Sequence, residues 1–179
     1  MIPLPKVRDK DLAAAKSRGR IGVAALTVDA TTKMEKLETS IQREAYNVGS
    51  HWTNWERRTR THQAHYYLGQ DFEPVARSVL SGLFEIDPSS TRKAHVMARV
   101  WIDSKRDRNI WCRYWDTKAT VSFSVLIQER DKSQTIQHYE GQDTGTDCAT
   151  LFLFPSGERV GEIVQGAFDT MMKRIGEAR

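Results

Sequence analysis

The sequence contains no long hydrophobic run, which excludes a membrane-spanning helix. Its uninterrupted hydrophobic stretches, such as residues 151–154, are no longer than four residues, whereas a helix needs about 20 consecutive apolar residues to cross a bilayer. The first residues also lack the basic and apolar segments of a secretory signal peptide. We therefore expect a protein that does not cross a bilayer, and that is either cytoplasmic or exported by a leader outside this sequence.

Cysteine is scarce, since only Cys112 and Cys148 are present. The pair forms a disulfide in an oxidising compartment or stays as two small buried residues in a reducing one, and the number of cysteines does not decide between these. A bond would join a predicted strand to the segment before the last helix and stabilise the fold by about 3–4 kcal/mol through chain entropy. The disulfide is a hypothesis that depends on export.

Neither sign of charge dominates the chain. Lys and Arg number 27 and Asp and Glu 23, for a net charge of +4, whereas dedicated nucleic-acid-binding domains carry a denser basic surface. The hydrophobic fraction of 39% and the charged fraction of 28% are typical of a folded protein rather than a disordered one. The length of 179 residues fits a single domain better than two.

Motifs of known catalytic sites are missing, including the glycine-rich phosphate loop, Gly-x-Ser-x-Gly and His-Glu-x-x-His. Asp143-Thr144-Gly145 matches the short signature of aspartic proteases. That signature normally ends a hydrophobic strand, whereas polar residues precede it here, so we interpret it as a turn. We expect no catalytic residue and no cofactor.

A metal site is also not predicted. Four potential ligands lie close together in sequence, namely His51, Glu56, His62 and His65. His62 and His65 could share a helical face, but no helix pattern surrounds them and no cysteine is nearby to complete a structural site. We interpret these histidines as exposed loop residues.

Hydrophobic periodicity predicts the elements of one domain at residues 20–179, preceded by an N-terminal arm or linker at 1–19 that includes about one helical turn. The predicted helices span 33–46, 72–84 and 157–176. The predicted strands span 21–28, 94–102, 110–115, 119–128 and 134–142, with polar turns at 105–109 and 130–133. Residues 49–70 have no clean period and are predicted as a long loop, an insertion or an irregular hairpin.

The order of these elements predicts the fold class. Alternating residues at 94–102 and 119–128 indicate half-buried strands of an antiparallel meander, and the amphipathic segments 72–84 and 157–176 indicate helices that cover it. We therefore predict an α+β fold: a mostly antiparallel sheet with two main helices packed on one face.

The segment 49–70 is the candidate binding site, because it mixes aromatic and basic residues. Arginines neutralise phosphates while aromatic rings stack on bases, but the same residue types are enriched in protein interfaces and at lipid headgroups. A third reading is that the rings fill a small core under a loop while the arginines are solvated. The predicted partner-binding residues are Trp52, Trp55, Arg57, Arg58, Arg60, Tyr66 and Tyr67.

The pattern resembles the YajG-like group of small bacterial envelope lipoproteins over residues 20–179. The resemblance is carried by Ile21-Gly22-Val23, by the helix Phe72-Glu73-Pro74-Val75-Ala76-Arg77-Ser78-Val79-Leu80, by the strands around Trp115-Asp116-Thr117-Lys118-Ala119-Thr120-Val121-Ser122-Phe123, and by the helix from Gly157. It implies a lipid-anchored periplasmic protein without enzymatic activity. The lipidated N-terminal cysteine of such proteins is absent from this sequence, and segment 49–70 is longer than the group implies.

These observations predict a non-catalytic envelope protein, associated with the outer membrane through a lipid anchor outside this sequence. It would form a homo-oligomer or join a larger complex through segment 49–70 and a sheet edge. The alternative is a cytoplasmic nucleic-acid-binding module that uses the same segment, and its affinity would fall steeply with salt.

Overall fold

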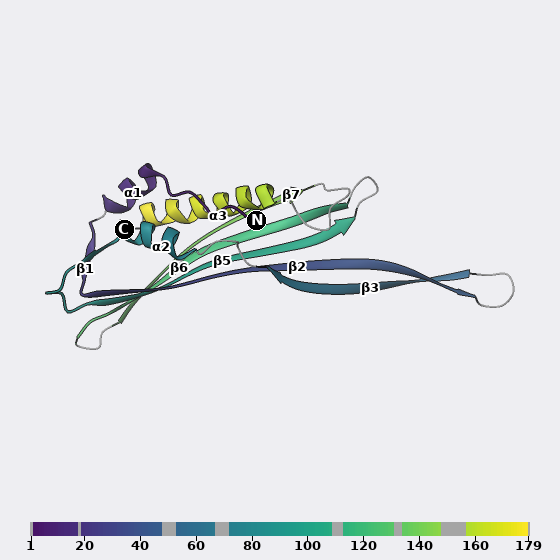
Figure 1. Cartoon of the computed structure of the whole chain (residues 1–179), viewed down its shortest axis with the longest axis horizontal. Helices are drawn as coiled ribbons and strands as arrows, with labels where there is room; N and C mark the ends of the chain where they lie inside the picture. Colours follow the sequence, from purple (N-terminus) through teal and green to yellow (C-terminus); the bar gives the residue numbers. More distant parts are fainter. Residues whose placement is uncertain are drawn as a thin grey trace.

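The computed structural model describes residues 2–17, 19–47, 53–66, 72–108, 113–130, 134–147 and 157–178. A layer of long strands carries helices on one side, and a two-stranded hairpin extends far beyond that layer (Figure 1). Along the chain the elements are α1 (Asp9–Lys16), β1 (Ile21–Val23), β2 (Ala25–Asn47), β3 (Thr53–Tyr66), α2 (Glu73–Leu80), β4 (Phe84–Ile86), β5 (Lys93–Arg108), β6 (Arg113–Gln128), β7 (Gln134–Asp147) and α3 (Gly157–Glu177).

The main sheet has five strands in the order β3-β2-β5-β6-β7, and β1 and β4 form a separate parallel pair. The chain reverses direction between β2 and β3, and again through the segment with α2 and β4 that leads to β5, so β2 and β5 are parallel. The other neighbouring strands of this sheet are antiparallel. The α+β class is therefore confirmed, and the sheet is mixed. The predicted meander of residues 94–142 is the antiparallel run β5-β6-β7.

The core lies between this sheet and the helices. Alternate residues of β5 and β6 are buried, as their period of two predicts, and α3 buries its apolar stripe against β6 and β7. The buried residues of these three elements include Val96, Ala98, Val100, Ile102, Val121, Phe123, Val125, Ile163, Val164, Ala167, Phe168 and Met171. Each large side chain contributes roughly 1.5–3 kcal/mol through burial. The predicted helix at 157–176 is confirmed.

Residues 2–17 form a strap that lies along α3 rather than a free linker. Pro3 packs on Gly161, and Gln165 bonds the backbone of Lys6 twice, accepting from its N–H at 2.7 Å and donating to its carbonyl at 3.1 Å. Arg8 forms an ion pair with Asp169 at 2.8 Å. Ala15 of α1 is fully buried, so the strap contributes to the core.

The predicted helix at 33–46 is wrong, since these residues belong to strand β2. Apolar residues do recur at helical spacing there, but Thr39 and Ser40 have low helix propensity. Strands β3 and β5 flank residues 34–38 on both sides, and this long-range pairing outweighs the local period.

Several predicted boundaries also differ from the structure. The strand predicted at 21–28 divides at Ala24 into β1 and β2, and α2 ends at Leu80, before the predicted end at 84. The predicted turn at 105–109 is strand as far as Arg108, and Asp143-Thr144-Gly145 lies inside β7 instead of forming a turn. Segment 49–70 contains β3, which makes it part of a hairpin rather than a loop.

Candidate functional site

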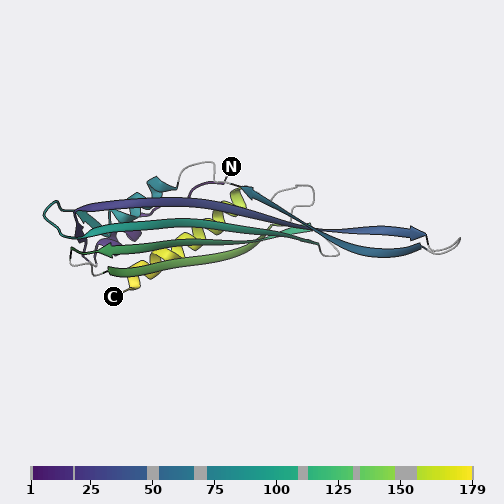
Figure 2. The same cartoon turned by 90° about the horizontal axis from the view of Figure 1, so that it is seen from below.

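The hairpin of β2 and β3 continues past the body of the molecule. Strand β2 pairs with β5 only from Ala25 to Glu38, but with β3 from Met34 to Asn47. Residues 39–47 and 53–61 therefore form nine register pairs beyond the last β5 contact, a length of about 30 Å at 3.3 Å per residue. We call these residues the projecting ribbon, and it extends away from the helices in both views (Figures 1 and 2).

The structure brings four of the predicted partner-binding residues together on this ribbon. Trp55, Arg57, Arg58 and Arg60 lie on β3, in register with Ala45, Arg43, Gln42 and Ser40. Tyr66 is at the opposite end of β3, in register with Met34, inside the five-stranded part of the sheet. Trp52 and Tyr67 lie outside the described residues, as do Cys112 and Cys148 of the predicted disulfide.

The register also places charges that sequence reasoning missed. Arg43 is opposite Arg57, and Glu44 is opposite Glu56. Like charges at directly opposite positions weaken an antiparallel pair, so two adjacent levels of the ribbon carry unfavourable placements of opposite sign. Arg43 and Glu44 fell in a segment with a helical period, and only the strand register reveals their partners.

The two edges of the sheet differ in whether side chains occupy their outward backbone groups. At the β7 edge, the carbonyl oxygen of Glu140 accepts a hydrogen bond from Arg174 at 2.7 Å, and that of Thr146 accepts one from Arg159 at 3.4 Å. Both arginines come from α3, and they occupy backbone acceptors that an added strand would need. At the other edge, no strand in the described ranges pairs with the outer side of β3.

The sheet face away from the helices carries a chain of hydrogen bonds between chemically active side chains. Ser124 Oγ lies 2.8 Å from His138 Nδ1, His138 Nε2 lies 3.4 Å from Glu140 Oε2, and Gln142 donates to Glu140 Oε1 at 2.7 Å. Serine, histidine and carboxylate in this order also occur in hydrolases.

A hydrolase would in addition need N–H donors aimed at the developing oxyanion. Ser124 lies on β6, which is paired with β5 on one side and β7 on the other, so the backbone donors of this strand serve the sheet. The Ser124–His138–Glu140 chain forms a cross-strand polar ladder on a solvated face.

The aspartic protease motif is equally incomplete. Asp143 Oδ1 accepts the backbone N–H of Thr144 at 2.8 Å, and the side chain of Asp143 lies against Gly166 of α3. Among the described residues, no second carboxyl group is hydrogen bonded to Asp143, as a shared-proton pair requires.

Glu56, His62 and His65 lie on strand β3, so the interpretation of these histidines as loop residues is wrong for His62 and His65. His62 and His65 are in register with Glu38 and Glu35, and His51 lies outside the described residues. Where side chains are described, no group of three or more His, Cys, Asp or Glu residues is arranged to hold a metal ion.

The pKa of Asp87 is shifted at the turn after β4. The side-chain and backbone hydrogen bonds of Ser89 hold this pKa below its ordinary value of 3.8.

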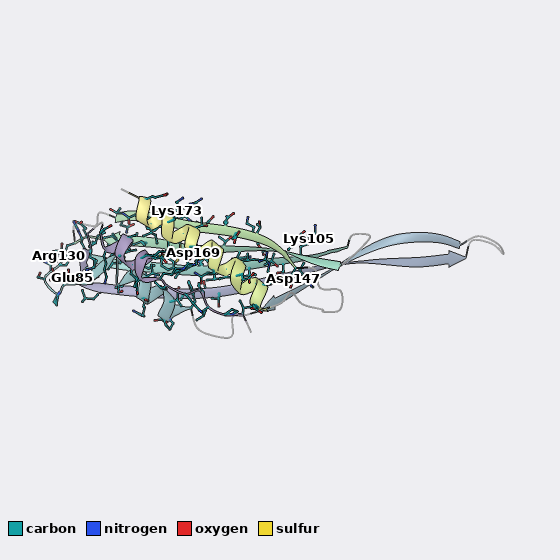
Figure 3. The ribbon with its side chains drawn as sticks, turned by 90° about the horizontal axis from the view of Figure 1, so that it is seen from above. Glu85, Lys105, Arg130, Asp147, Asp169 and Lys173 are labelled. Atoms are coloured by element: carbon teal, nitrogen blue, oxygen red, sulfur yellow. The ribbon has the colours of Figure 1, made fainter. Side chains whose placement is uncertain are left out.

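Charged side chains of both signs are spread over the described surface (Figure 3). Asp169 and Lys173 lie on α3, Lys105 and Asp147 lie toward the end from which the ribbon extends, and Glu85 and Arg130 lie at the other end. Among the side chains that the structure describes, both signs of charge therefore occur at each end of the body, in keeping with the small net charge.

Within the described residues, no helix combines the length and apolar character needed to cross a bilayer. No protein-family model matches the chain, and no curated protein matches it in sequence. The projecting ribbon is therefore defined by its geometry alone.

Proposed function

We propose that this chain is a non-catalytic assembly protein that binds another protein through its projecting ribbon. The observation that carries the proposal is the continuation of β2 and β3 for nine register pairs beyond the sheet. A mostly antiparallel sheet with helices on one face would serve as the rigid base, and the ribbon would be the part that reaches the partner.

The energetics of strands support this role. A two-stranded hairpin without further packing is marginally stable in water, and its unpaired backbone groups favour the addition of another strand. Proteins commonly use such an edge to bind an extended segment of a partner. The ribbon presents an edge along each strand, so a partner strand would both stabilise it and be held by it.

Charge placement gives a second argument. The pairs Arg43/Arg57 and Glu44/Glu56 occupy opposite register positions, which costs stability in an isolated ribbon. A partner with charges of both signs would offset these placements. Trp55 at a neighbouring level adds the type of residue that dominates the binding energy of protein interfaces.

The proposed location is the bacterial periplasm, with attachment to the outer membrane by a lipid anchor. This part of the proposal rests on the resemblance to YajG-like lipoproteins, and the disulfide of Cys112 and Cys148 would belong to that compartment. Nucleic-acid binding is the second candidate, favoured by the placement of Arg57, Arg58 and Arg60 on one strand of the ribbon.

Site-specific photo-crosslinking in intact cells tests the proposal. A benzophenone amino acid would replace Thr59 on the ribbon, and in separate variants Thr27 on the exposed sheet face or Lys173 on α3. We expect a protein adduct from position 59 and weaker or no adducts from the two controls. Equal adducts from all three positions, or adducts from the controls alone, would contradict the proposal. A nucleic-acid adduct at position 59 would favour the second candidate.

A further inference from the structure

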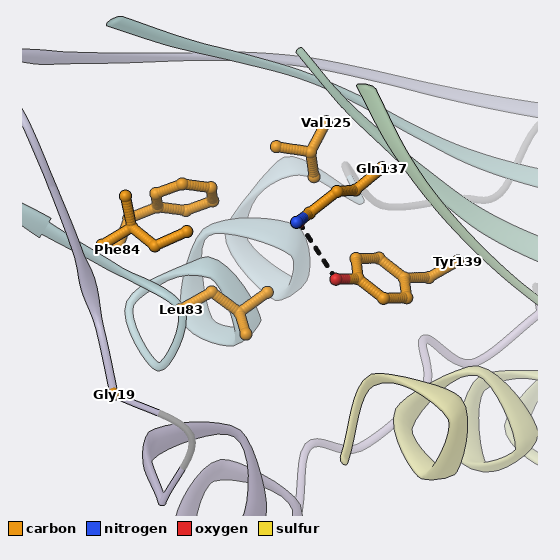
Figure 4. A pocket seen from close by; sticks show the side chains of 7 residues that line it. Gly19, Leu83, Phe84, Val125, Gln137 and Tyr139 are labelled. Atoms are coloured by element: carbon orange, nitrogen blue, oxygen red, sulfur yellow. Dashed lines mark hydrogen bonds between the residues drawn. The ribbon is translucent and has the colours of Figure 1, made fainter. Parts of the chain in front are cut away.

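A cavity of about 140 Å³ opens between the β1–β4 end of the molecule and the helix side of β6 and β7 (Figure 4). Its apolar wall comes from four residues that converge from three parts of the chain, namely Ile21, Leu83, Phe84 and Val125. Phe84 is only 5% exposed and Val125 only 1%. The wall is therefore fixed by the core.

The opposite wall is polar, and its orientation is set by an internal hydrogen bond. The hydroxyl of Tyr139 donates to Gln137 Oε1 at 3.1 Å. With its oxygen engaged, the Gln137 amide retains N–H groups, and no acceptor for them is found among the described residues. The Tyr139 oxygen retains its lone pairs. This wall can donate to a ligand acceptor while the apolar wall contacts the ligand body.

Gly19 lies at the rim of the cavity. Its N–H bonds the carbonyl of Lys16 at 3.0 Å, which closes the turn after α1, and its φ of +82° is one that glycine adopts without strain. A Cβ atom at this position would meet no described atom within 4 Å. The rim at this position is therefore open.

Size and charge define the ligand class. A buried cavity of about 150 Å³ with apolar walls holds one benzene ring, so this cavity fits a single six-membered ring. None of the described lining residues carries a charge at neutral pH, and an ionic group would lose hydration beside them without a counter-charge. The walls are suited to a neutral molecule.

We propose that this cavity is a binding site for a small neutral ring compound with one hydrogen-bond acceptor, such as a carbonyl oxygen. The ring would contact Leu83, Phe84 and Val125, and the acceptor would bind the amide of Gln137. The site is remote from the projecting ribbon, so the proposal is independent of the function inferred above.

Backbone NMR titration of the full chain tests this site, with benzamide as the neutral probe, toluene as the probe without an acceptor and benzoate as the charged probe. We expect saturable shifts at Leu83, Phe84 and Tyr139 with benzamide, weaker binding of toluene, and an affinity for benzoate at least tenfold lower. The comparison of probes uses the native protein and does not depend on a variant that folds.

Two matched variants assign the polar contact. Gln137→Leu should lower benzamide affinity roughly three- to tenfold, the effect of one lost hydrogen bond, and leave toluene affinity unchanged. Gln142→Leu, on the same strand but on the opposite face, should change neither. Absence of saturable benzamide shifts at these amides, equal affinity for benzamide and benzoate, or equal effects of the two variants would overturn the assignment.

Discussion

At Gly141 the backbone of α3 lies directly against strand β7. A Cβ atom there would overlap the carbonyl oxygen of Ala167 and the amide nitrogen of Met171, which belong to the helix backbone and cannot rotate away. Gly176 differs, because a Cβ there would lie 3.6 Å from the Cβ of Ala14, an ordinary contact. The absence of a side chain is therefore required at Gly141 and not at Gly176.

We expect Gly141→Ala to lower the free energy of unfolding by about 2 kcal/mol or more, since overpacking in cores typically costs about 1–3 kcal/mol. Gly176→Ala should leave it unchanged or raise it by up to about 1 kcal/mol, because alanine favours helix. Urea denaturation measures both. A Gly141→Ala protein as stable as the wild type would contradict the close approach of helix and strand.

Gly145 explains why one sequence interpretation failed. Glycine and aspartate are turn residues, so the sequence alone favours a turn at Asp143-Thr144-Gly145, yet this segment continues strand β7. A Cβ atom at Gly145 would come within 2.8 Å of the side chain of Ile163 in α3. The glycine provides space for the helix, and its local sequence gives no sign of this contact.

At the scale of elements, the arginines of α3 protect the β7 edge. Arg174 donates to the carbonyl oxygen of Glu140 at 2.7 Å, so an incoming strand would have to displace it. Lys173, the preceding residue, pairs with Glu177 at 3.7 Å on the exposed side of the helix. The two residues thus provide a matched comparison of a capped edge and a solvated helix charge.

We expect Arg174→Ala to associate at protein concentrations where the wild type and Lys173→Ala do not. The lost hydrogen bond should also reduce stability by about 1 kcal/mol. Light scattering across a concentration series measures the association. If Arg174→Ala and Lys173→Ala scatter alike, the guanidinium does not protect the edge.

Elements whose burial is one-sided were predictable from sequence. The apolar stripe of α3 and the alternating pattern of β5 and β6 show which side of each element faces the core. These periods therefore predict a helix and two strands correctly. Strand β2 was not predictable in the same way, since residues 34–38 are held by β3 and β5 and their local period is helical. Long-range strand pairing has no local signature.

The candidate site was predictable in composition but not in shape. Arg57, Arg58 and Arg60 were identified because basic and aromatic residues cluster there. Their position on a projecting ribbon follows from the mismatch between the β2–β3 and β2–β5 registers. The sequence of one strand does not show how far that strand pairs with each of its neighbours.

At the scale of the whole molecule, the structure has two parts: the body, which is the sheet with its helices, and the projecting ribbon. The described core lies between the sheet and the helices, and residues 39–47 and 53–61 lie beyond the last register pair of β2 with β5. Glu38 and His62 are register partners at the base of the ribbon. A two-residue Asn-Gly turn between them would close the hairpin in a geometry that suits antiparallel strands.

Replacing residues 39–61 by Asn-Gly therefore tests the central claim directly. Size-exclusion chromatography of cell extract gives the apparent mass of the full and the shortened protein. The thermal unfolding midpoint of each purified protein shows whether it is folded. We predict that the shortened protein keeps its midpoint within a few degrees and elutes as a monomer, while the full chain elutes in a larger assembly. A shortened, folded protein that still elutes in that assembly would contradict the claim that the ribbon binds the partner.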